Sequence, residues 1–318
     1  MATANLIVTQ VGPHTSIQDS RRRGMMRFGV PASGPMDRIA FAAANAALGN
    51  PTTAPVIEVS MAGLALSCVT GDVTIAVTGG GFQVAVDAAT CGSWSVINLQ
   101  AGASLVIRPG HWGSWAYLAF AGQLQAASWL GSVSTHGPSG FGGGRLVAGQ
   151  QITIENAERR DQCLGEIPCP VSARPRPAVH AVLGPQQQFF PAEAIASLFS
   201  QPFTLSDAYD RMGVRLAGPL LRPAGKLDMP SQAILRGSIQ VSGDGIPTVL
   251  LADHQTTGGY PKIATIIADD LDGFAQLRSR NQVTFNQVTP EAAISLARTR
   301  HEAQSRYLAN LGTRARLR

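Results

Sequence analysis

Residues 71–86 read GDVTIAVTGGGFQVAV, and this stretch indicates the class of fold. The runs from Val73 to Val77 and from Phe82 to Val86 are short and rich in the β-branched and aromatic residues that strands favour. Gly79-Gly80-Gly81 separates the two runs and is a strong turn signal. We therefore expect two short strands joined by a tight connection.

The same pattern continues on both sides of this stretch. Further runs of the same kind lie at 57–59, 105–107 and 115–120, and Gly102, Pro109-Gly110 and Gly113 punctuate them. The 318 residues include 34 glycines and 20 prolines, which favours many short strands over long helical bundles. Strands spaced this closely predict a β-barrel or a β-sandwich.

One helix is expected to interrupt the first half, from Met36 to Leu48. Ser33-Gly34-Pro35 precedes it and Gly49 follows it, which is the usual placement of Pro near the start of a helix and Gly just past its end. Ile39, Ala43, Ala46 and Ala47 give this helix an apolar face.

The stretch 156–177 is rich in charge, proline and cysteine and has no clear period, so we interpret it as a connection. This gives an N-terminal lobe at 1–158, a connection at 159–177 and a C-terminal lobe at 178–318. In the C-terminal lobe we expect strands at 178–183, 239–241, 249–252 and 264–267, a helix near 191–199, and a helix from Pro290 to about Leu311 capped by Thr289.

Composition excludes several classes of function. The formal net charge is +5, but no basic stripe interleaved with aromatic residues is present, so we expect no nucleic-acid partner. The four cysteines lack zinc-ligand spacing and the six histidines are unpaired, so we expect no metal and a reduced, cytoplasmic protein. No signal-peptide pattern and no run of about 18 apolar residues occurs, so we expect no membrane association.

Three polar, glycine-rich segments are candidates for function. The first contains Ser33, Gly34 and Asp37 at the expected helix start, where backbone N–H groups can hold an anion. Equally, Asp37 could only complement the helix dipole. The second segment runs from Gly131 to Arg145 and either approaches a ligand through its glycines or is a flexible surface loop.

The third segment, residues 253–262, reads DHQTTGGYPK and follows an apolar strand. Asp253 can act as a base or pair with a cation, and Gly258-Gly259 can present backbone N–H groups. Lys262 is one of only two lysines in a chain rich in arginine. Together these groups can bind a carboxylate, phosphate or amide and stabilise a developing oxyanion, although a tight turn with a solvated lysine is the alternative.

These segments belong to a longer ordered set of motifs. The set comprises Gln18-Asp19, 29–37 (GVPASGPMD), Ala44-Asn45 with Gly49-Asn50, Ser134-Thr135 with Phe141-Gly142-Gly143, 184–186 (GPQ), 210–219 (DRMGVRLAGP), 237–241 (GSIQV) and 253–262 (DHQTTGGYPK). It resembles the biotin-dependent carboxyltransferase family, also called allophanate hydrolase subunit 2. This family includes the C subunit of bacterial 5-oxoprolinase, the carboxyltransferase region of urea carboxylase, and the Kip-type antagonist of a sporulation-kinase inhibitor.

The resemblance implies a mainly β (α+β) protein with a few helices and two cyclophilin-like β-barrel lobes. It also implies a complex with a subunit-B-like cyclophilin-fold protein and, for the oxoprolinase, a subunit-A-like barrel protein. No Met-Lys-Met biotinylation site is present, so we expect no biotin attached to this chain.

The leading hypothesis is therefore a hydrolase, a subunit of an ATP-dependent 5-oxoprolinase that opens 5-oxoproline to glutamate. Two alternatives remain: carboxyl transfer from carboxybiotin to urea or a similar amide, and a non-catalytic regulator that binds a kinase-inhibitor subunit. The candidate catalytic residues are Lys262, Asp253 and Asp37. The candidate substrate-binding residues are Gln255, Thr256, Thr257, Gly258, Gly259, Tyr260, Arg211, Ser33 and Gly34.

Overall fold

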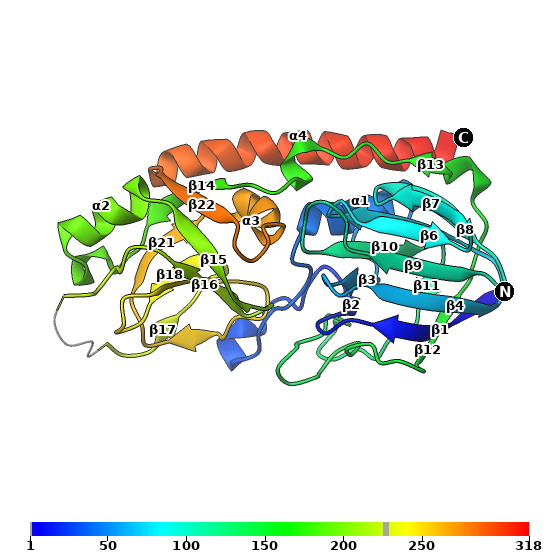
Figure 1. Cartoon of the computed structure of the whole chain (residues 1–318), viewed down its shortest axis with the longest axis horizontal. Helices are drawn as coiled ribbons and strands as arrows, with labels where there is room; N and C mark the ends of the chain where they lie inside the picture. The colour runs from blue at the N-terminus through cyan, green and yellow to red at the C-terminus, as the bar shows by residue number, and fades with distance from the viewer. Residues whose placement is uncertain (1, 225–228, 318) are drawn as a thin grey trace. The chain divides into compact units, whose positions relative to one another are not determined.

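The computed structural model describes residues 2–224 and 229–317 (Figure 1). The chain divides into two compact units. The first unit comprises Met1–Arg22, Ser33–Arg174 and Ala303–Arg318, and the second comprises Arg23–Ala32 and Pro175–Glu302. The segment 23–32 therefore groups with the second unit, and the end of the chain groups with the first. A division of the chain at the connection 159–177 would instead assign each of these segments to the other unit.

The first unit is built from two antiparallel sheets. One sheet has the order β11 (Gln123–Leu124), β12 (Gln151–Glu155), β1 (Thr3–Val11), β4 (Leu64–Thr70), β9 (Ser104–Arg108), β6 (Gln83–Val86) and β7 (Ala89–Gly92). The other has the order β13 (Gly165–Glu166), β8 (Ser95–Leu99), β5 (Val73–Gly79), β10 (Ala116–Phe120), β3 (Val56–Val59) and β2 (Ser16–Gln18).

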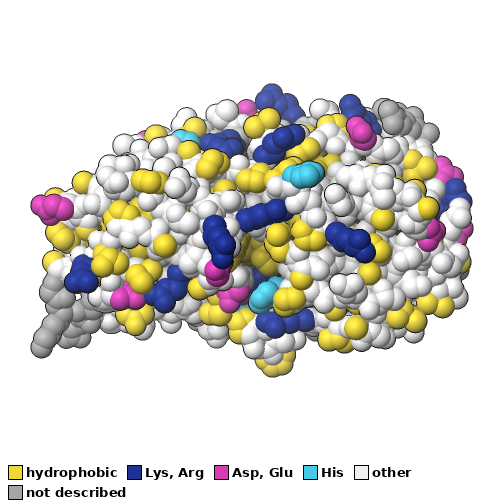
Figure 2. Space-filling model, in the orientation of Figure 1, with side chains coloured by type: hydrophobic (Ala, Val, Ile, Leu, Met, Phe, Trp, Pro, Cys, Tyr) yellow, Lys and Arg dark blue, Asp and Glu magenta, His cyan; other side chains and the backbone are white. Residues whose placement is uncertain are grey.

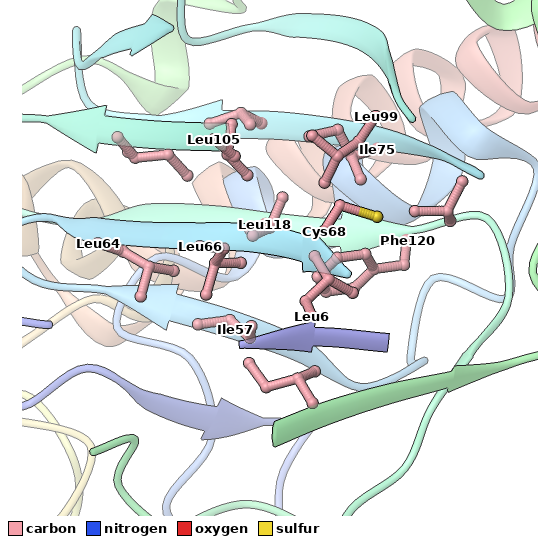
Figure 3. Packing of buried hydrophobic residues seen from close by; sticks show 14 of the residues in the cluster. Leu6, Ile57, Leu64, Leu66, Cys68, Ile75, Leu99, Leu105, Leu118 and Phe120 are labelled. Atoms are coloured by element: carbon pink, nitrogen blue, oxygen red, sulfur yellow. The ribbon is translucent and has the colours of Figure 1, made fainter. Parts of the chain in front are cut away.

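Apolar side chains from both sheets form the core of this unit. Figure 3 shows Leu6, Leu64 and Leu66 gathered with Ile57 and Leu118, and the Cys68 thiol is buried in the same cluster. The prediction of a closed barrel for residues 1–158 is thus wrong in its closure. The strands form two separate sheets, whose edge strands are β11 and β7 in one sheet and β13 and β2 in the other.

Helix α1 (Arg38–Leu48) covers the second sheet by packing on β5 and β10. Strand β5 is buried along its whole length. Its valines and isoleucine join the core, while Thr78 donates a hydrogen bond of 2.7 Å to the Ala40 carbonyl of the helix. The sequence predicted this helix and its end at Gly49, whose φ of +75° suits glycine.

The second unit contains a closed barrel, which confirms the expected barrel for this half of the chain. Its order is β14 (Ala178–Leu183), β21 (Lys262–Ile266), β18 (Ser238–Val241), β19 (Pro247–Leu250), β16 (Gly213–Ala217), β15 (Phe203–Tyr209) and β22 (Gln282–Gln287), and β14 and β22 pair in parallel. A small sheet joins β17 (Gln232–Ala233) to β20 (Thr257–Gly258).

Helices α2 (Ala192–Ser200) and α3 (Ala268–Ala275) pack on β22 and β14. Helix α4 (Pro290–Leu317) begins after Thr289, whose hydroxyl accepts a hydrogen bond from Ala292 N (3.2 Å), as predicted for a cap. The short 3-10 helices are η1 (Met26–Phe28), η2 (Asp161–Cys163), η3 (Val171–Ala173) and η4 (Gln187–Phe189).

The visible face carries mostly neutral and apolar atoms with scattered charged side chains (Figure 2), as the charged fraction of 14% leads one to expect. In the described part of the chain, no helix combines the length and apolar character needed to cross a bilayer.

Candidate functional site

A β-bulge in the barrel sets the direction of Lys262. Ile239 of β18 faces Ala264 of β21, but the next residue, Gln240, faces Lys262, so the pairing slips by one residue. Directly paired residues point to the same face of a sheet. The bulge therefore turns Lys262 onto the face of Gln240 instead of the face of Ala264.

Gln240 and Lys262 belong to a row of polar residues that crosses the barrel. Gln240 pairs with Thr248 of β19, and Thr248 pairs with Arg215 of β16. The apolar neighbours Ile239, Val249 and Val214 are fully buried and fill the barrel interior. The row Arg215–Thr248–Gln240–Lys262 thus lies on the outer face of the barrel.

Three members of this row, Arg215, Thr248 and Gln240, line a pocket of about 490 Å³. A volume in this range is typical of small-molecule sites. Its walls are Asp210, Met212, Gly213, Arg215, Gln240, Ser242, Asp244, Thr248, Leu250, Gln255 and Tyr260. Most of these side chains are polar, which suits a polar ligand, and Lys262 itself is not among them.

Lys262 is only 4% exposed, and its Nζ has no hydrogen-bond partner among the described residues. Burial lowers the pKa of this amine below its usual range. A buried ammonium without a partner is costly, so the side chain is suited to receive an anionic group. The other lysine of the chain, Lys226, lies outside the described residues.

The backbone of Lys262 is held firmly. Its N–H donates to Gln186 Oε1 (2.8 Å), and Gln186 Nε2 donates to Gln232 Oε1 (2.5 Å). A Cβ at Gly184 would lie 2.1 Å from the Lys262 carbonyl oxygen, so the motif glycine permits close approach of the two backbones. These contacts fix the start of β21 at the bulge.

Asp253 and Arg211 form a buried bidentate ion pair. Arg211 Nε lies 2.9 Å from Asp253 Oδ2, and the arginine also donates from its terminal nitrogen to Oδ1 at 3.0 Å. Asp253 is fully buried and Arg211 is nearly so. Both carboxylate oxygens of the candidate base are therefore engaged, an arrangement that fits a positioning role better than proton abstraction.

The other residues of the 253–262 segment are divided between pocket and scaffold. Gln255 and Tyr260 line the pocket. Thr257 and Gly258 form β20, and the Thr256 carbonyl accepts a hydrogen bond from Ile234 N (3.1 Å). A Cβ at Gly258 would lie 2.9 Å from Gln240 Nε2 and 2.6 Å from an Ile234 methyl, so the segment needs glycine there, whereas Gly259 has more room.

Ser33, Gly34 and Asp37 belong to the first unit, whereas the residues of the pocket walls belong to the second. Asp37 is the N-cap of α1 and its Oδ1 accepts a hydrogen bond from Ala40 N (2.9 Å). Gly34 N donates to Gln18 Oε1 (3.2 Å). Ser33 has a φ of +55°, and its buried hydroxyl has no hydrogen-bond partner among the described residues.

A buried network holds this loop in place. Tyr117 donates its hydroxyl proton to Glu58 Oε2 (2.8 Å) and accepts a hydrogen bond from Asp37 N (2.7 Å), while Met36 N also donates to Glu58 Oε2 (2.7 Å). Burial, with Glu58 and Asp37 nearby, raises the pKa of Tyr117 far above its usual range. The phenol therefore stays protonated and acts as a fixed donor.

Sequence reasoning missed Arg215, Thr248 and Gln240 as pocket residues. Two of them stand within motifs, and each is a polar residue that alternates with buried apolar residues, which is the signal that could have found them. Among residues 2–224 and 229–317, no group of three or more His, Cys, Asp or Glu side chains is placed to hold a metal ion.

Most of the chain matches one known protein family. Residues 28–287 match the family described as carboxyltransferase domain, subdomain A and B. The chain belongs to this carboxyltransferase domain family. The matched range includes the barrel row, the pocket and the motif at 253–262.

Two relatives of known name are similar over almost their whole length. The chain is 34% identical over 294 residues to the C subunit of 5-oxoprolinase from Haemophilus influenzae, covering 92% of this chain and 94% of that protein. It is 30% identical over 312 residues to the C subunit of 5-oxoprolinase from Escherichia coli, covering 97% and 98%.

A solved structure of the same fold belongs to a larger protein. The crystal structure of the Kluyveromyces lactis urea carboxylase superposes with a TM-score of 0.82 at 25% identity. The match covers 97% of this chain but only 29% of that one, so this chain corresponds to under a third of the urea carboxylase.

Proposed function

We propose that this carboxyltransferase-family chain is a subunit of a heteromeric complex that opens 5-oxoproline to glutamate at the expense of ATP. The observation that carries the proposal is the buried amine of Lys262, which has no hydrogen-bond partner among the described residues and ends the polar row. The similarity of the chain to two 5-oxoprolinase C subunits, over nearly their full length, supports the same interpretation.

The substrate chemistry suits this site. 5-Oxoproline carries a carboxylate and a cyclic amide, and hydrolysis of the amide places negative charge on the carbonyl oxygen in the transition state. A lysine with no competing partner can hold either negative charge, and a preorganised cation of this kind typically lowers a barrier by several kcal/mol. Gln240 and Gln255 supply amide groups that orient the ring from the pocket wall.

The roles of the remaining candidates follow from their contacts. Arg211 and Asp253 position the 253–262 segment through their ion pair. Backbone N–H groups at Gly258 and Gly259 and the side chains of Thr256, Thr257 and Tyr260 complete the substrate-binding set. In the first unit, Asp37 with Ser33 and Gly34 is a second candidate binding loop for this complex.

The complex has further requirements. We propose that its other members are a subunit-B-like protein of cyclophilin-like fold and a subunit-A-like barrel protein. We also propose that the complex is cytoplasmic and that the lobes of this chain have a cyclophilin-like fold. The chain has no Gly-x-x-x-x-Gly-Lys phosphate loop, so we assign ATP to the complex and not to this pocket. No biotin is proposed on this chain.

Reconstitution tests the proposal. This chain is co-expressed with the proteins encoded beside it, the complex is purified, and glutamate released from 5-oxoproline is measured with and without ATP. ATP-dependent release that disappears when this chain is omitted supports the oxoprolinase function. A stable complex that releases no glutamate under either condition rejects it.

Carboxyl transfer is the second candidate, supported by the similarity to the urea carboxylase structure. In that case Lys262 would hold the carboxylate of the transferred group, and a biotin carrier and a biotin carboxylase would come from other chains. Inhibition of the activity by avidin distinguishes this function from the first. A complex inactive in both assays would favour the regulatory role.

A further inference from the structure

The turn at residues 129–132 holds an apolar side chain where turn chemistry disfavours it. Trp129 N donates to the Ser132 carbonyl (2.8 Å) and Ser132 N donates to the Trp129 carbonyl (3.2 Å). Leu130 and Gly131 have φ values of +50° and +75°. Two positive φ values define a type I′ hairpin turn, where Asn-Gly is preferred and a branched apolar residue is strained.

Leu130 is nonetheless 46% exposed, so burial does not compensate the strain. Phe141 is 53% exposed and stacks on the neighbouring Trp129, with ring centroids 4.6 Å apart and planes inclined by 27°. We call Trp129, Leu130 and Phe141 the apolar tip. Neither turn stability nor core packing explains why this part of the first unit presents leucine and phenylalanine to solvent.

The apolar tip stands on a rigid base. Arg22 is buried, donates to the Trp129 carbonyl (3.0 Å) and the Ser134 carbonyl (2.8 Å), and lies 4.6 Å from the centre of the Trp129 ring. Asp19 accepts hydrogen bonds from Ser132 Oγ (2.7 Å), Ser134 Oγ (2.6 Å) and Val133 N (2.9 Å). A loop ordered in advance loses little conformational entropy when a partner binds.

The exposed charged side chains in the loops that form the apolar tip and its base are positive. Arg21 and Arg145 are exposed in the same loops, while residues 121–150 contain neither aspartate nor glutamate. The carboxylate of Asp19 is already occupied by the hydrogen bonds of the loop. A surface that complements the tip would therefore combine an apolar hollow with an acidic border.

We propose that the apolar tip is a docking surface for a partner subunit that offers an apolar hollow bordered by acidic side chains. The inference rests on the proposed heteromeric function and adds the place of contact to it. Exposed, rigid aromatic and aliphatic side chains at the centre of an interface commonly dominate its binding energy. The glycine-rich segment 131–145, expected as a ligand or surface loop, would then serve subunit assembly.

Leu130→Asn gives a test in which the stability of the free chain should not fall while the affinity for the partner should. Asparagine suits the positive φ, so the melting temperature of the free chain should stay the same or rise. The dissociation constant for the purified subunit-B-like protein should rise at least about tenfold. Phe141→Ser should weaken binding similarly, and Arg21→Glu should mainly slow association.

Val171→Asn is the matched control, because Val171 is 82% exposed in η3 of the same unit and is not part of the tip. It should bind the partner like the unaltered chain. If Leu130→Asn and Phe141→Ser also bind like the unaltered chain, the docking proposal is wrong while the heteromeric function stands. If the unaltered chain binds no partner, both are overturned.

Discussion

Lys262 faces Gln240 across strands β21 and β18, one residue out of step with the pairing of Ala264 and Ile239. That single bulge moves a lysine from the barrel interior to the outer face, at the end of a row whose other three members line the pocket. In the interior the amine would be surrounded by apolar side chains, whereas on the outer face it ends a row that contains Thr248 and Arg215. The position of Lys262 in the candidate site therefore depends on one irregularity in the pairing of one strand.

Replacing Lys262 by methionine should stabilise the fold. Burial lowers the pKa of Lys262 in the folded protein, so between the folded and unfolded pKa values the unfolded chain binds more protons, and stability rises with pH. The cost of the lysine is thus greatest below its folded pKa and fades as the pH approaches about 10.4, the unfolded value. Thermal melts of both proteins at pH 7 and above pH 10 check this.

The expected gain is higher thermal stability for Lys262→Met at pH 7 and a smaller difference at the alkaline pH. A variant that is less stable than the unaltered chain at pH 7 would mean that the ammonium has a stabilising partner. The interpretation that Lys262 has no such partner among the described residues would then be wrong.

Breaking the ion pair between Arg211 and Asp253 should be costly. Asp253→Asn leaves a buried guanidinium without its charge partner, which typically costs about 3–5 kcal/mol of unfolding free energy. The matched control is Asp244→Asn, since the pair of Asp244 with Arg215 is about half exposed and such pairs contribute about 1 kcal/mol or less. Urea unfolding measures both, and equal losses would refute the distinction.

Replacing Asp270 should also lower the free energy of unfolding by a large amount. Asp270 is fully buried in α3, and Arg176, Arg300 and His180 all contact its carboxylate, at 3.2, 2.7 and 2.8 Å. Asp270→Asn removes the charge that these groups share, so we expect a loss of about 3 kcal/mol or more. Increased amide exchange in the part of α4 around Arg300 would accompany the loss, and unchanged exchange there would contradict this account.

The sequence predicted the elements of the fold better than their closure. Runs such as 73–77 and 178–183 are strands in the structure, and α1 ends at Gly49 as expected. Local runs do not specify which distant strands pair, however, so the same pattern fits a sandwich and a barrel. Helix α3 was missed because ADDLDGFA is rich in aspartate and contains glycine, and the sequence does not show tertiary contacts such as that of Asp270 with Arg300.

The site was predictable in its residue types but not in its geometry. The unusual lysine and the polar segment at 253–262 directed attention to Lys262, Gln255 and Tyr260. Nothing in KIATI reveals the bulge, because the slip arises from pairing with β18. The ion pair of Asp253 with Arg211 joins residues 42 positions apart, so sequence alone could not show that the candidate base is occupied.

Removing the Tyr117 hydroxyl should loosen the loop before α1. Tyr117→Phe leaves the Asp37 N–H without this acceptor and takes a donor from the buried Glu58, at a cost of about 1–3 kcal/mol. Urea unfolding measures the loss, and amide exchange at Met36 and Asp37 should become faster. Unchanged stability would show that water or another group replaces the hydroxyl.

The most direct measurement of the central claim is the ATP-dependent rate of glutamate release by the reconstituted complex containing Lys262→Met. Arg298→Met, which removes an exposed charge from α4 in the same unit, is the control for net charge. We predict an intact complex in both cases, a rate reduced on the order of a hundredfold for Lys262→Met, and an unaltered rate for Arg298→Met. A Lys262→Met complex that releases glutamate at the full rate would contradict the assignment of Lys262 to the substrate site.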